Sequence, residues 1–162
     1  MPFIIRVSRN KNNWIIPEQF EDGQIPGDVL KDLNTEKNTL SLFRLENKEA
    51  LKRFVPAFAS SRNKEDKFDY ILFDSALLKD FEPYFDESKK SNLPDHEVNK
   101  WHFDITTLSA QNILSLAEKL INNSERCRIS VKDVNKQIIK AVDAGWVQLE
   151  DIPQHLREQL EI

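Results

Sequence analysis

Apolar and polar positions along the chain follow patterns that predict both strands and amphipathic helices. Runs rich in β-branched and aromatic residues predict strands at 3–7, 39–45, 68–74 and 98–106, and a short one at 127–129. The run FDYILFD at 68–74 carries apolar residues at both odd and even positions, which is typical of a strand covered on both faces. We therefore expect 68–74 to lie in the interior of a sheet.

Apolar residues spaced three or four positions apart predict helices, which are concentrated toward the C-terminus. The predicted helices cover about 47–58, 75–81, 107–121, 131–143 and 152–161. Asn47 and Ser130 precede two of them and have side chains that favour helix starts. The order of elements predicts an α+β (or α/β) fold, as a single domain over 1–162. Amphipathic helices would pack on a mixed sheet of about four to five strands.

Composition supports a folded domain and excludes several enzyme classes. Of the 162 residues, 40% are hydrophobic and 31% charged, so the chain can bury a core and does not resemble a disordered protein. The three glycines are too few and too scattered for a Walker loop, a dinucleotide-binding turn or a G-x-S-x-G elbow. The single cysteine, Cys127, excludes an internal disulfide and zinc sites built on cysteine pairs.

Charge and targeting signals narrow the partners that we expect. With 23 Lys+Arg against 27 Asp+Glu, the net charge of -4 gives no overall attraction to nucleic acid. An early charge at Arg6 argues against a signal peptide, and no apolar stretch is long enough for a membrane span. We therefore expect a cytoplasmic protein without a nucleic-acid or membrane partner, and no motif indicates a cofactor or a resident metal.

Acidic residues and histidines between 74 and 104 suggest a metal-dependent hydrolase or nuclease as an alternative function. Imidazole and carboxylate groups can hold a divalent metal or form an acid–base pair. The candidates are Asp74, Asp95, His96, His102 and Asp104. No recognised ligand spacing such as H-E-x-x-H is present, so a helix-capping acid and a solvated sheet face are the simpler explanations. A nucleotide-sensing domain is disfavoured further, because the chain lacks a glycine-rich turn.

The charged, proline-interrupted segment 82–97 points to protein binding. It predicts an exposed loop that is long for a compact domain, and such loops are often functional. Aromatic residues inside a charged rim are typical of protein-binding surfaces, although they could equally anchor the loop to the core. The candidate contact residues are Tyr84, Phe85, Asp86, Glu87, Lys89 and Lys90. By elimination, the sequence favours a small acidic regulatory module that binds another protein, in the manner of an immunity protein or antitoxin, over an enzyme.

Overall fold

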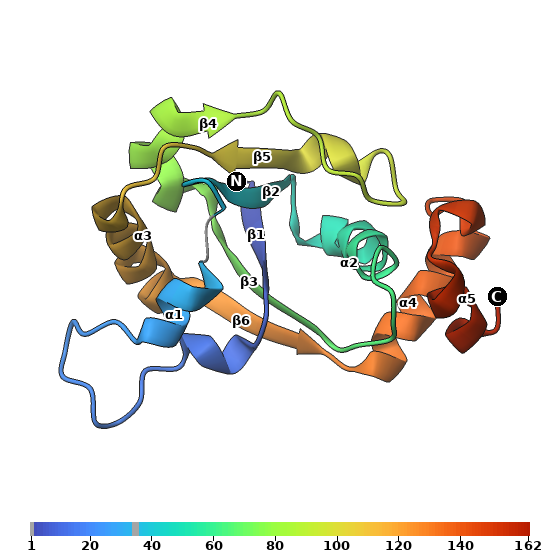
Figure 1. Cartoon of the computed structure of the whole chain (residues 1–162), viewed down its shortest axis with the longest axis horizontal. Helices are drawn as coiled ribbons and strands as arrows, with labels where there is room; N and C mark the ends of the chain where they lie inside the picture. The colour runs from blue at the N-terminus through green and yellow to red at the C-terminus, as the bar shows by residue number, and fades with distance from the viewer. Residues whose placement is uncertain (1, 34–35) are drawn as a thin grey trace.

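A computed structural model describes residues 2–33 and 36–162, and six strands within these residues form one sheet (Figure 1). The strands are β1 (Phe3–Ser8), β2 (Leu40–Leu45), β3 (Phe68–Asp74), β4 (Phe85–Asp86), β5 (His102–Ile105) and β6 (Ser124–Ile129). Their order across the sheet is β4-β5-β2-β1-β3-β6. The first strand of the chain therefore lies at the centre, hydrogen-bonded to β2 on one side and to β3 on the other.

Helices connect the strands and dominate the C-terminal part. The α-helices are α1 (Gly27–Asp32), α2 (Leu51–Ala59), α3 (Ala110–Asn123), α4 (Val131–Asp143) and α5 (Gln154–Leu160). The 3-10 helices are η1 (Lys11–Trp14), η2 (Lys48–Ala50), η3 (Ser75–Tyr84), η4 (Val98–Trp101) and η5 (Leu149–Asp151). The predicted α+β class is confirmed. Among the described residues, no helix is long and apolar enough to cross a membrane.

Helices cover both faces of the sheet, so the molecule has two hydrophobic cores. On one face, α2, α4 and α5 pack over a core that includes Ile5 and Phe54. On the other face, α1, α3 and η3 pack over a core that includes Ile4 and Leu120 (Figure 1). Six of the seven residues of β3 are buried, and β3 lies between β1 and β6. The interior position predicted for 68–74 is therefore confirmed.

The sheet differs from the sequence prediction in the number and direction of its strands. It has six strands rather than four or five, and all the pairings between the described strands are antiparallel rather than mixed. Apolar residues on both faces of a strand indicate that helices cover it, but they carry no information on strand direction. The additional strand is β4, in which Phe85 and Asp86 pair with Ile105 and Asp104 of β5.

The strand predicted over 98–106 is wrong in its first half. Residues 98–101 form η4, and the strand begins only at His102. The cause lies just upstream, where Oδ1 of Asp95 accepts hydrogen bonds from the backbone N–H groups of Glu97 at 2.9 Å and Val98 at 3.4 Å. A side chain that satisfies two successive amides in this way stabilises a turn in place of extended backbone.

Candidate functional site

The residues considered for metal-dependent chemistry lie in separate environments. Asp74 caps η3, because its Oδ1 accepts a hydrogen bond from a backbone N–H of that helix at 2.8 Å. Asp95 is buried and pairs with the guanidinium of Arg53 through contacts of 2.5 and 3.0 Å. His96 is exposed, with Nε2 4.0 Å from Asp151. In the part of the chain that the structure describes, no group of three or more His, Cys, Asp or Glu side chains could hold a metal ion.

Two of these residues, His102 and Asp104, do come together on β5. Nε2 of His102 lies 3.3 Å from Oδ1 of Asp104, and its Nδ1 lies 2.7 Å from the carbonyl oxygen of Lys89. The same Asp104 oxygen accepts a hydrogen bond from the hydroxyl of Ser41 at 2.7 Å. Both ring nitrogens of His102 thus face oxygen atoms. The pair ties the segment after β4 to β2.

The residues proposed for partner binding lie in the edge strand β4 and on either side of it. Tyr84 is 41% exposed, whereas Phe85 is half-buried, with its ring centroid 4.8 Å from that of Phe103. Hydrogen bonds from Ser88 to Asp86 lower the pKa of this carboxyl group. Glu87, Lys89 and Lys90 are exposed. The further part of the predicted loop is different: residues 93–95 are buried, so an exposed loop over the whole of 82–97 is wrong.

Phe85 and Tyr84 are expected to differ in their effect on stability. Phe85→Ala should lower the free energy of unfolding by about 1–2 kcal/mol, less than the ~3–5 kcal/mol typical of a fully buried phenylalanine. Tyr84→Ala should change it by less than about 0.5 kcal/mol, since Tyr84 is an exposed surface residue. Urea denaturation of both single variants measures the difference, and equal losses would contradict it. Tyr84→Ala is therefore the variant suited to binding experiments.

An apolar groove of about 410 Å³ lies between α2 and α4. Its apolar lining comes from Leu51, Val55, Ile129, Ala141 and Trp146, while Lys52 and Lys140 add two ammonium groups. We call this the α2–α4 groove. Its residues come from segments about 80 positions apart, so no local periodicity reveals it.

Trp146 forms one wall of the α2–α4 groove and is 40% exposed. It follows Gly145, whose φ of +70° lets the backbone turn after α4. The guanidinium of Arg53 lies 5.6 Å from the centroid of the indole ring. This contact places the indole over the side chain of α2 that also pairs with Asp95. A large aromatic surface is thus held in a defined position while it remains open to solvent.

The edge of the sheet lies beside this groove. Ile129, which belongs to β6, contributes to the groove lining. Among the described strands, β6 pairs with β3 alone, so the backbone groups on its other side have no strand partner. Such an edge can accept an extended segment of another chain through main-chain hydrogen bonds.

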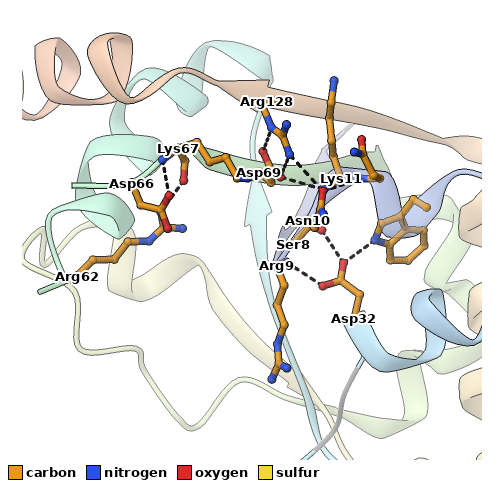
Figure 2. Close-up of polar contacts among 12 residues, drawn as sticks. Ser8, Arg9, Asn10, Lys11, Asp32, Arg62, Asp66, Lys67, Asp69 and Arg128 are labelled. Carbon is orange, nitrogen blue, oxygen red and sulfur yellow. Dashed lines mark hydrogen bonds and ion pairs between the residues drawn. The ribbon is translucent and has the colours of Figure 1, made fainter. Parts of the chain in front are cut away.

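A second feature that the sequence analysis missed is a polar cluster at the end of β1, shown in Figure 2. Asp32 is only 1% exposed and accepts three hydrogen bonds. The donors are the hydroxyl of Ser8 at 2.6 Å, Nε1 of Trp14 at 2.5 Å and the backbone N–H of Arg9 at 2.8 Å. Asp32 therefore ties β1 and η1 to α1, which is a structural role.

Asp69 is the other buried carboxylate of this cluster, at 2% exposure. The guanidinium of Arg128 binds both its oxygens at 2.7 Å, and the backbone N–H of Lys11 donates at 2.9 Å (Figure 2). Burial alone would raise the pKa of Asp69, but these hydrogen bonds and the charge of Arg128 more than offset it, so the pKa lies below its usual value. The Asp69–Arg128 pair is thus neutral as a unit and joins β3 to β6.

No protein-family model matches the chain, and neither a curated protein nor a solved structure shows significant similarity to it. The assignment of a function therefore rests on the geometry of this chain.

Proposed function

We propose that this protein binds another protein through the α2–α4 groove and the neighbouring edge of β6. The observation that carries the proposal is Trp146, an exposed aromatic side chain held at the wall of an apolar groove. Tryptophan is enriched among the few residues that supply most of the free energy of protein association. A groove of about 410 Å³ also falls within the usual size range of binding pockets, about 300–1,000 Å³.

The chemistry of the surface defines the expected partner segment. Its backbone would extend β6 by one strand, and alternate side chains would then point toward the α2–α4 groove. The apolar lining suits one large apolar side chain of the partner. The cations of Lys52, Lys140 and the exposed Arg126 on β6 favour acidic residues on either side of it. We therefore infer an extended, acidic segment with a central apolar residue.

Binding of this kind would make the protein a regulatory module that acts by occupying its partner, as an immunity protein or antitoxin does. Its action in the cytoplasm is part of the same proposal. The alternative, a metal-dependent hydrolase, has less support, because the structure gathers only His102 and Asp104 of its five candidate residues. The exposed Tyr84 on the opposite edge of the sheet supports a second possible contact surface, the segment 84–90.

Peptide selection followed by calorimetry tests the proposal. Random peptides displayed on phage are selected against the folded protein, and enriched peptides are synthesised and titrated. We expect the enriched sequences to carry a large apolar residue flanked by Asp or Glu. Trp146→Ala should weaken their binding by at least about 2 kcal/mol, or roughly 30-fold in Kd, because the indole forms a wall of the groove.

Matched variants separate the two contact surfaces. Tyr84→Ala removes an equally exposed aromatic residue from the other edge of the sheet and should leave the Kd of these peptides unchanged. The double variant Lys52→Glu/Lys140→Glu should weaken acidic peptides without unfolding the protein, since both lysines are exposed. If Tyr84→Ala abolishes binding while Trp146→Ala has no effect, the groove proposal is wrong and the segment 84–90 is the contact surface. Failure to enrich any peptide would also count against the proposal.

A further inference from the structure

A polar hollow of about 350 Å³ opens beside the ends of β1 and β3, and it shares no residue with the α2–α4 groove. Three cations contribute to its lining: Arg9 after β1, and Arg62 and Lys67 from the connection between α2 and β3. Figure 2 shows Arg62 and Lys67 to one side of the polar cluster of Asp32 and Asp69, whereas the side chain of Arg9 extends away from both. We call this the basic hollow.

The charges of the basic hollow do not balance. The hollow has two carboxylates. The first, Asp69, already accepts a hydrogen bond at each of its oxygens from the guanidinium of Arg128. Asp66 is the other, and its Oδ1 accepts a hydrogen bond from the backbone N–H of Lys67 at 2.8 Å. Three cations against this one remaining carboxylate leave an excess of two positive charges, in a chain whose net charge is -4.

Arg62 is held in position before any ligand is present. Its Nη1 donates to the carbonyl oxygen of Lys67 at 2.8 Å, the guanidinium's single hydrogen bond to the residues that the structure describes. The guanidinium carbon lies 4.9 Å from the ring centroid of Phe68 and 6.0 Å from that of Phe58. Burial lowers the pKa of Arg62, which means that its charge is incompletely solvated. An anion that reached the remaining N–H groups would stabilise this charge.

We propose that the basic hollow binds a phosphate group, with Arg62 as its principal ligand and Lys67 as a flanking cation, while Arg9 adds positive charge at longer range. A phosphate carries about 1.5–2 negative charges near neutral pH, which offsets most of the positive excess in the hollow. Its oxygens also fit the parallel N–H groups of a guanidinium. The volume of about 350 Å³ leaves room for a small organic group attached to the phosphate.

Titration with inorganic phosphate, followed by NMR, tests the site. The signals to follow are the Nε–H of Arg62 and the backbone amides of residues 8–9 and 62–67. We expect saturable shifts confined to these groups, and weaker binding of acetate, which carries one charge. Arg62→Gln should raise the Kd for phosphate about tenfold or more, the usual effect of losing a charge-assisted hydrogen bond. O-phosphoserine is the second probe. If it binds as tightly as inorganic phosphate, the natural ligand is a phosphate ester; if it binds more weakly, the ligand is free phosphate.

Two further variants keep the test decisive if Arg62→Gln unfolds. Lys67→Gln leaves the backbone carbonyl that holds Arg62 in place and should raise the Kd about two- to fivefold. Lys136→Gln removes one exposed cation from α4, outside the hollow, and should leave the Kd unchanged. The proposal is overturned if the shifts do not saturate, if sodium chloride at equal ionic strength reproduces them, or if Lys67→Gln and Lys136→Gln bind phosphate equally.

Discussion

Asp32→Ala is expected to lower the free energy of unfolding by about 3–5 kcal/mol. The substitution leaves the hydroxyl of Ser8, the indole N–H of Trp14 and one backbone N–H without their acceptor. Each buried donor that loses its partner costs about 1–3 kcal/mol. The carboxylate also lies close enough to the partly buried Arg6 for its charge to stabilise the guanidinium. Urea denaturation followed by circular dichroism measures the loss.

Two comparison variants identify the cause of that loss. Asp28→Ala removes an exposed acid from the same helix, α1, and should cost less than about 1 kcal/mol, because only its interaction with the helix dipole is lost. Asp32→Asn retains an acceptor oxygen and should fall between the two. If Asp32→Ala were no more destabilising than Asp28→Ala, the three hydrogen bonds would not contribute to stability as described.

Phe54→Ala is expected to be destabilising to a similar extent, about 3–5 kcal/mol. The ring is fully buried in the core between α2 and the sheet. Its centroid lies 4.9 Å from that of Phe43, 5.8 Å from that of Phe58 and 6.3 Å from that of Phe68. Truncation therefore creates a cavity and removes three aromatic contacts at once. The midpoint of urea denaturation, with the slope of the transition held fixed, reports the change.

The reference for Phe54 is Lys52→Ala, two residues earlier in α2. Lys52 is exposed, so its truncation should change stability by no more than about 0.5 kcal/mol. A loss below about 1 kcal/mol for Phe54→Ala would mean that the surrounding rings close over the cavity, and that the aromatic cluster is less rigid than its geometry indicates.

Local patterns predicted much of the fold. The buried strand 68–74 and the helix capped by Ser130 are predictable from sequence, because burial on both faces and an N-cap hydroxyl leave signatures within a few residues. The predicted strand over 98–106 begins too early. The alternation of apolar and polar residues starts upstream of His102, but Asp95 stabilises a turn there, and the strand begins at His102. The direction of the strands and the pairing of β4 depend on distant contacts, which periodicity does not report.

The candidate sites also depend on contacts between residues that are distant in the sequence, so local patterns predict them less well. Asp69 and Arg128 lie 59 positions apart, and no sequence pattern near either residue predicts their ion pair. No local pattern singles out Trp146, because the groove beside it forms only where α4 packs against α2. Tyr84 and Phe85 are neighbours in the sequence, yet Tyr84 at the end of η3 is exposed, whereas Phe85 in β4 packs against Phe103. Whether this edge binds a partner stays a prediction.

The central position of β1 has a consequence for folding kinetics. Phe3 pairs with Leu45 on one side and with Asp74 on the other, so β1 joins the half-sheet of β2, β5 and β4 to the pair of β3 and β6. Neither junction is a local hairpin, and each requires the closure of a long loop before its contacts become favourable. We therefore expect refolding on a timescale of about milliseconds to seconds, as in other domains dominated by non-local strand pairing, rather than microseconds.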